Sequence, residues 1–324
     1  MRNWITFLMT LLVGSSVSYI NADSGQISFE AGYRRDNISW SHQIPACDPF
    51  FRTKTKFEDV DIFQIGLKAR TMMGCNFYGR ASAYWGWVLD GDFKQSISAF
   101  AHPSFGISDF SQEIEFKAQN RDVLDDKYVY DLNIAIGYPF FFCDCTMAIA
   151  PVVGYAVNEQ IFRLDQDGFE FESFSDCSEF FFPVSGDSCC TRKYNNRWYG
   201  PFVGFDFTYR PCGECWSLYA EIEYHWAQFK AKFNNDFGAS GGFFDTHSHR
   251  SKRAHGWVVN LGADYDLSCD WTIGFSVKIT DFSAHRHHRN SCNDSFFGRD
   301  FSGREKNSHK WNSNSFNLAF GKVF

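Results

Sequence analysis

Apolar and polar residues alternate one for one along several long segments of the chain. In Trp271–Thr280 the odd-numbered residues are apolar, and the even-numbered residues are polar or glycine. Because successive side chains of a β-strand point to opposite faces, this pattern predicts a strand with one apolar and one polar face. A tilted strand crosses a bilayer with about 9–11 residues. Ten segments are long enough and share the pattern: Gly25–His42, Phe57–Met73, Asn76–Leu89, Lys127–Phe140, Thr146–Asn158, Trp198–Tyr209, Trp216–Phe229, Gly256–Leu267, Trp271–Phe282 and Asn314–Phe324.

The connections between these segments alternate in length. Four are short turns that carry cysteine, and the other five are long and polar: His42–Lys56, Asp90–Asp126, Glu159–Arg197, Lys230–His255 and Ser283–Ser313. Short periplasmic turns and long external loops are typical of outer-membrane barrels, in which an even strand number places both termini on the periplasmic side. The sequence therefore predicts an all-β fold, a ten-stranded antiparallel transmembrane β-barrel with short periplasmic turns and five long external loops. A soluble all-β protein is the alternative.

The first residues predict export. Met1–Ala22 begins with Arg2, continues through an apolar stretch and ends in small or polar residues, as a secretory signal peptide does. We expect residues 1–22 to be removed and residues 23–324 to form a single barrel domain. No later stretch reaches the roughly 18 apolar residues that a helical span needs, so a membrane-integral form must be a barrel. The expected location is the bacterial outer membrane, with its lipid as a partner.

Composition supports this class. Aromatic residues make up 19% of the chain, including 38 Phe, while the mean hydropathy is −0.33. Outer-membrane barrels conceal their apolar residues on alternate positions and add aromatic girdles at both interfaces. The net charge of −7 argues against a nucleic-acid partner, because phosphate binding needs a cationic surface.

If the polar faces point inward, the lumen contains charges of both signs. We expect these charges to form a hydrated network of ion pairs. Inward glycines leave some room, so a narrow solute path and a mostly blocked lumen are both open alternatives. The principal lumen candidates are Arg34, Lys68, Arg70, Arg80, Asp131, Asp206, Glu221, Glu223, Asp264 and Lys278.

All 11 cysteines follow the predicted signal peptide, which suits an oxidising compartment. Cysteines on the two sides of the membrane are too far apart to pair with one another, since a disulfide needs Cα atoms within roughly 7 Å. We expect the turn cysteines to form disulfide crosslinks to neighbouring envelope proteins, and these candidates are Cys75, Cys143, Cys145, Cys212, Cys215 and Cys269.

Short motifs resemble two families. The ten-strand plan, the stretch 130–134 (YDLNI), the pair Gly154-Tyr155 and the aromatic end at Phe324 resemble the omptins, which are ten-stranded outer-membrane proteases. The cysteine content and the size resemble the Protochlamydia outer membrane protein family of chlamydiae. That resemblance implies a barrel with porin-like relatives, in envelopes known for disulfide-crosslinked proteins.

The omptin resemblance implies a candidate catalytic site. Omptins use an Asp-x-Asp pair facing an Asp-x-His pair, and the matching connections here contain Asp90 and Asp92 and then Asp245 and His247. His247, oriented by Asp245, would act as general base while the opposite carboxylates hold a water. Parity along the third segment predicts that Asp90 and Asp92 point inward. No cofactor is expected, and the loop histidines complete no recognisable metal site.

The long external loops favour a further alternative. The segment Asp165–Cys190 is rich in Phe, and exposed aromatic residues in such number indicate either a lid over the barrel mouth or a partner surface. The sequence thus predicts a porin-like or disulfide-crosslinked structural protein of the outer membrane. An omptin-type endopeptidase and a surface adhesin are the alternatives.

Overall fold

A computed structural model describes the chain as an all-β protein. The described residues are 22–44, 50–73, 77–100, 111–118, 128–143, 146–164, 170–171, 192–235, 247–267, 270–294 and 299–324. The predicted signal peptide lies almost wholly outside them. Within these ranges, no helix has the length and apolar character needed to cross a membrane.

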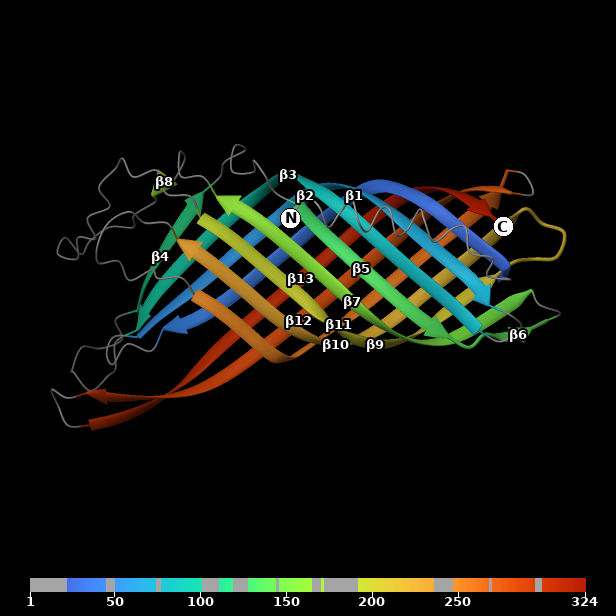
Figure 1. The fold of residues 1–324 in the computed structure, drawn as a ribbon. Coiled ribbons are helices and arrows are strands. Elements are labelled where there is room, and N and C mark those ends of the chain that lie inside the picture. Colours follow the sequence, from blue (N-terminus) through green and yellow to red (C-terminus); the bar gives the residue numbers. More distant parts are fainter. Residues whose placement is uncertain are drawn as a thin grey trace, which may run out of the picture.

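The strands form one antiparallel sheet that closes on itself (Figure 1). The barrel wall has ten strand positions. β5 and β6 together form one of these positions, because they are two consecutive segments that both pair with β7. The strands are β1 (Ala22–Ile44), β2 (Phe50–Met73), β3 (Phe77–Phe100), β5 (Tyr128–Gly137), β6 (Phe140–Phe142), β7 (Met147–Leu164), β9 (Arg192–Tyr209), β10 (Trp216–Asn235), β11 (His247–Asp266), β12 (Trp271–Asp294) and β13 (Arg299–Val323). Pairing of β1 with β13 closes the barrel, from Gln26↔Val323 to Ser41↔Ser308. The predicted ten-stranded barrel is confirmed, and the soluble alternative is wrong.

The strands run much further than the sequence pattern indicated. β12 continues to Asp294 and β13 begins at Arg299, although the alternation extended only from Trp271 to Phe282 and from Asn314 to the end. Two additional short strands, β4 (Ser111–Ala118) and β8 (Glu170–Phe171), extend the sheet beyond β3. Large parts of the predicted external loops are therefore paired strands, and the predicted loop extents were wrong.

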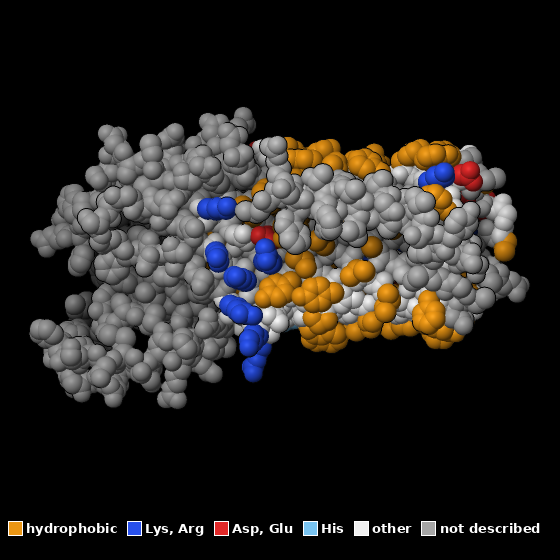
Figure 2. Space-filling model, viewed as in Figure 1, with side chains coloured by type: hydrophobic (Ala, Val, Ile, Leu, Met, Phe, Trp, Pro, Cys, Tyr) orange, Lys and Arg blue, Asp and Glu red, His pale blue; other side chains and the backbone are white. Residues whose placement is uncertain are grey.

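The outer face of the barrel carries a belt of exposed hydrophobic side chains, seen in orange in Figure 2. Ile273 and Phe275 on β12 are about half exposed, as are Leu318 and Phe320 on the neighbouring β13. Such a continuous apolar surface is unfavourable in water and is what lipid requires. The belt therefore marks the membrane-spanning part.

The distribution of polar and apolar residues reverses at the outer end of this belt. On β9, Val203 and Phe205 face outward within the belt while Asp206 is buried inside the barrel. Further along the same strand, Trp198 is buried inside and Arg197 is exposed. Strand geometry continues unchanged, but the solvent outside changes from lipid to water. The barrel is therefore built like a membrane protein in the belt and like a water-soluble barrel beyond it.

Candidate functional site

The lumen within the belt is crossed by ion pairs centred on Arg80 of β3. Its guanidinium lies 2.9 Å from the Asp206 carboxylate of β9 and 3.0 Å from that of Glu221 on β10, and it also contacts Glu223. All four side chains are at most 6% exposed. Because β3 and β10 are not neighbours in the sheet, these contacts bridge the lumen rather than lie along its wall.

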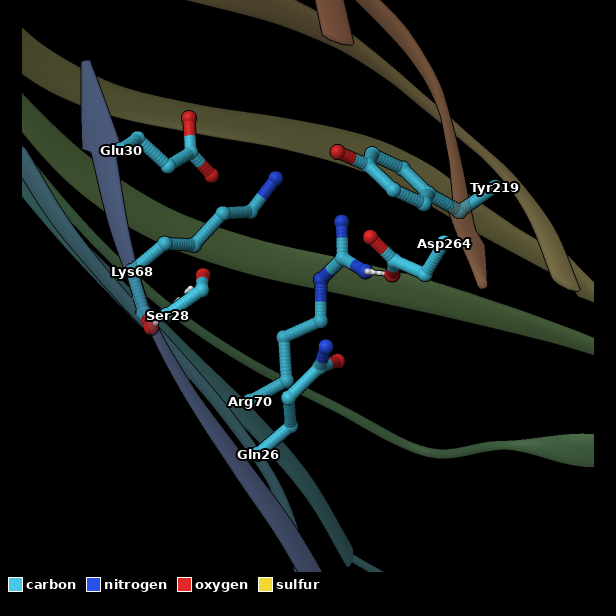
Figure 3. A pocket seen from close by; sticks show the side chains of 7 residues that line it. All are labelled: Gln26, Ser28, Glu30, Lys68, Arg70, Tyr219 and Asp264. Carbon is cyan, nitrogen blue, oxygen red and sulfur yellow. Dashed lines mark hydrogen bonds and ion pairs between the residues drawn. The ribbon is translucent and has the colours of Figure 1, made fainter. Parts of the chain in front are cut away.

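Two more cations reach Glu221 from a second side of the barrel. Lys68 and Arg70 of β2 each place a nitrogen 2.8 Å from the same Glu221 oxygen. Arg70 also lies 3.9 Å from Asp264 and over the ring of Tyr219, as Figure 3 shows. Several cations around one carboxylate compensate the cost of removing it from water, which a single partner seldom achieves.

A third set of ion pairs lies nearer the outer end. Arg34 of β1 donates to Asp36 at 2.7 Å and to Asp131 of β5 at 2.8 Å, and Lys278 of β12 lies 3.9 Å from Asp131. The Arg34 guanidinium also lies 5.3 Å from the centre of the Trp311 ring. Arg34 thereby joins the charged layer to an apolar layer above it.

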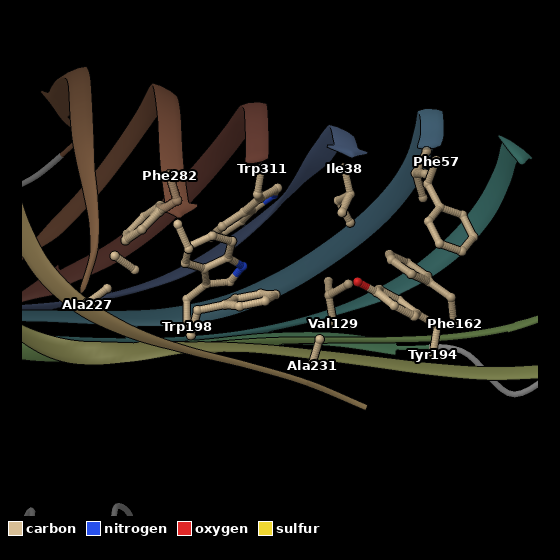
Figure 4. Close-up of a cluster of buried hydrophobic side chains, with 14 of the residues drawn as sticks. Ile38, Phe57, Val129, Phe162, Tyr194, Trp198, Ala227, Ala231, Phe282 and Trp311 are labelled. Atoms are coloured by element: carbon tan, nitrogen blue, oxygen red, sulfur yellow. The ribbon is translucent and has the colours of Figure 1, made fainter. Parts of the chain in front are cut away.

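That apolar layer is a cluster of buried side chains drawn in Figure 4. Every position around the barrel contributes to it: Ile38, Phe57, Phe93, Val129, Phe162, Trp198, Phe229, Val258, Phe282 and Trp311 are among its members. Trp198 is 1% exposed, and its ring centre lies 4.3 Å from that of Phe229 and 5.4 Å from that of Phe282. We call this cluster the aromatic plug. The sequence analysis assigned only a polar lumen and missed it.

Two of the inward glycines make room for tyrosine rings of the neighbouring strands. A Cβ at Gly66 would lie 2.2 Å from the ring of Tyr84, and a Cβ at Gly262 would lie 2.3 Å from the ring of Tyr219. Tyrosines of the adjacent strands therefore occupy the room that the glycines provide. Of the two alternatives that the sequence left open, this arrangement favours the mostly blocked lumen.

The structure places all ten predicted lumen residues on the inward side of their strands. Eight of the ten are buried, and Arg70 and Lys278 are partly exposed with side chains at 17% and 23%. The sequence reasoning supplied their direction through strand parity but not their partners. The buried His225, bonded to Glu223 at 2.6 Å, joins the same network.

The predicted catalytic residues do not form a site within the described residues. Asp90 is exposed, and Phe93 rather than Asp92 is buried in the barrel. The inward parity predicted for the pair was wrong, because β2 and β3 pair irregularly between Glu58 and Ile62, and across this irregularity the buried positions of β3 change from Val88 to Phe93. Asp245 lies outside the described residues. For His247 only the backbone is described, as the first residue of β11.

The omptin-type alternative stays a hypothesis with a direct test. If the Asp-x-Asp and Asp-x-His pairs act together, the purified barrel in lipid cleaves peptides that contain basic residues, and Asp90→Ala or His247→Ala abolishes cleavage. Asp281→Ala, which removes another exposed aspartate, serves as the control that retains activity. Absence of cleavage by the lipid-reconstituted protein would remove this alternative.

Three of the turn cysteines are described, at the end of the barrel with short turns. Cys143, Cys212 and Cys215 are exposed free thiols. The β6–β7 and β9–β10 turns are neighbours, because the Arg210 N–H donates to the Thr146 carbonyl at 2.8 Å and the Thr146 hydroxyl lies 3.7 Å from the Cys212 sulfur. Cys75, Cys145 and Cys269 lie outside the described residues. Among the described residues, no group of side chains has the arrangement of a metal site.

A closed antiparallel barrel with a lipid-facing belt defines this chain as an integral outer-membrane β-barrel protein. Over residues 28–324 its sequence matches the family described as Protochlamydia outer membrane protein, and the chain belongs to that family. The predicted outer-membrane location is confirmed at the level of the family. A search of curated proteins found no match.

The chain also matches solved structures of outer-membrane proteins. The outer membrane protease OmpT from Escherichia coli superposes with a TM-score of 0.59 at 12% sequence identity, covering 94% of this chain and 97% of that one. The translocator domain of the autotransporter NalP from Neisseria meningitidis gives a TM-score of 0.35 at 10% identity, covering 100% and 96%. At these identities the likeness to OmpT shows the fold alone.

Proposed function

We propose that this protein is a structural component of the outer membrane, with a closed lumen and with periplasmic turns that form disulfides to other envelope proteins. The observation that carries the proposal is the double occlusion of the lumen by the Arg80 network and the aromatic plug. Open porins have sixteen or more strands around an aqueous channel, whereas small barrels are filled by side chains. A filled barrel favours anchoring over solute passage.

The exposed thiols supply the anchoring chemistry. Cys143, Cys212 and Cys215 lie on short turns that pack side by side, so the thiols are presented from a rigid end of the barrel. Accessible thiols in an oxidising compartment form and exchange disulfides, whereas buried ones are inert. A rigid barrel bonded through several turns would brace the membrane against the proteins beneath it.

Non-reducing electrophoresis of alkylated, intact envelopes tests the crosslinks. We expect species of high mass that collapse to monomer on reduction, and we expect the combined Cys143→Ser, Cys212→Ser and Cys215→Ser variant to lose most of them. Cys47→Ser with Cys177→Ser, on the predicted external side, is the matched control and keeps them. Monomer alone from intact envelopes of the unaltered protein would overturn the proposal.

Planar-bilayer recordings on the same purified protein separate this function from the porin-like one. The closed lumen predicts no steady ion conductance. A stable conductance that persists in the cysteine variant would instead support the porin-like function.

A further inference from the structure

Three cations lie in a row across neighbouring strands on the outer face of the barrel. Lys230 of β10 is the cross-strand partner of Arg197 on β9 and of Arg250 on β11. All three side chains are exposed. Like charges directly opposite one another destabilise a sheet. This row, which we call the basic row, is therefore unfavourable unless anions lie against it.

More cations surround the basic row. Between Ala227 and Phe229 the β10 strand advances by two residues while β11 advances by three, from Ala254 to Ser251, so β11 contains one additional residue. The bulge leaves Lys252 and Arg253 both exposed. Lys232, two positions beyond Lys230, is exposed as well. We call the basic row together with these three residues the basic cluster.

Protein carboxylates balance little of this charge. Within the part of the chain that the structure describes, Glu159 pairs with Arg197, and the other five members of the basic cluster have no acidic partner. This contrasts with Arg35 on the outer face of β1, which binds Asp61 at 2.7 Å. Among the described residues, the charge of the basic cluster is thus mostly unbalanced.

The position of the basic cluster identifies the ligand class. It begins four residues beyond Trp226 on β10 and Trp257 on β11, each 52% exposed at the outer end of the hydrophobic belt. Aromatic residues of such belts lie at the level of the lipid headgroups. On the face shown in Figure 2, Lys and Arg side chains gather directly beside the belt, toward the end opposite the short turns.

We propose that the basic cluster binds the phosphate groups of an anionic glycolipid in the outer leaflet. Two phosphates spanning the basic row would turn a repulsive ladder into a set of charge-assisted hydrogen bonds, for which the arginine fork is well suited. The adjacent Trp226 and Trp257 provide the apolar surface for the acyl chains. This site is independent of the proposed turn disulfides and of the closed lumen.

Native mass spectrometry of the delipidated full-length barrel tests the proposal, with purified diphosphorylated lipid A as the probe. The unaltered protein binds it, and the combined Lys230→Gln and Arg250→Gln variant binds it about 30-fold more weakly, because each basic residue at an anionic surface contributes roughly one kcal/mol. The control is Lys310→Gln with Lys322→Gln. Lys310 is exposed but lies opposite Ser39 and Ser283, so it has no cation beside it. The control retains binding.

The unfolding midpoint of the variant is a second measurement, and it also shows whether the variant folds. Without lipid, the midpoint is expected to change in the direction opposite to that seen with lipid. In neutral detergent without lipid, removal of the repulsion leaves the unfolding midpoint of the Lys230→Gln, Arg250→Gln variant equal to or above that of the unaltered protein. With lipid A present the order reverses. Equal binding by the variant, or equal binding of dephosphorylated lipid A, overturns the proposal. So does equal stabilisation by inorganic phosphate, which would identify a free anion as the ligand.

Discussion

Replacing Arg80 with alanine is expected to destabilise the folded barrel by about 3–5 kcal/mol, because it leaves the buried carboxylates of Asp206 and Glu223 without their shared cation. Glu221 retains Lys68 and Arg70, so the damage is concentrated on the other two. A urea titration of the protein in lipid vesicles, followed by tryptophan fluorescence, measures the change in unfolding free energy.

The matched control is Arg35→Ala. Its guanidinium also binds an aspartate at 2.7 Å, but the side chain is 48% exposed on the outer face. Exposed pairs contribute about 0–1 kcal/mol, so this variant is expected to lose no more than that. In a double-mutant cycle, Glu223→Gln relieves part of the Arg80→Ala loss. Similar losses for Arg80→Ala and Arg35→Ala would contradict a network of buried ion pairs that stabilises the barrel.

The second large effect is expected in the aromatic plug. Trp198→Ala removes the side chain that packs between Phe229 and Phe282 and is 1% exposed. The resulting cavity is surrounded by residues from all sides of a closed sheet, which limits collapse, so we expect a loss of about 3–5 kcal/mol. The same urea titration applies, with near-ultraviolet circular dichroism to report on the remaining aromatic packing.

Trp87→Ala supplies the comparison for the plug. Trp87 is 43% exposed on the lipid-facing side, where it stacks on Phe63 with ring centres 6.3 Å apart. Lipid chains fill the space that this truncation leaves, so the loss is expected to be clearly smaller than at Trp198. Equal losses at the two positions would show that the plug contributes no more to stability than the lipid interface does.

Strand parity predicted the direction of many side chains but failed where the sheet is irregular. It indicated an outward Phe275 and an inward Lys278, and the structure places them so. It failed at Asp92, because β2 and β3 pair irregularly around Asp59, which has a φ of 50°, and alternation alone carries no sign of such an irregularity. Register irregularities of this kind also produce the paired exposure of Lys252 and Arg253.

The sequence could not predict which side chains pair with one another in the lumen, and the reason here is different. Which carboxylate meets Arg80 depends on the closure and stagger of the whole barrel, which bring β3 opposite β10. The sequence indicated that Arg80 and Glu223 both point inward. It contained no information that they meet across the lumen, because they are separated by 143 positions and by three intervening strands.

The amino-acid sequence by itself determined the class of the protein: ten alternating segments, short turns with cysteine and a lipid-facing aromatic belt, because alternation is a local property that lipid on one side enforces. Only the tertiary structure decided that the Arg80 network and the aromatic plug lie within the lumen and that the strands continue far beyond the hydrophobic belt. There the polar and apolar faces exchange, so that Trp198 is buried where the belt would require a polar residue. The same exchange turns Arg197 and Lys230 outward, beyond the acyl chains.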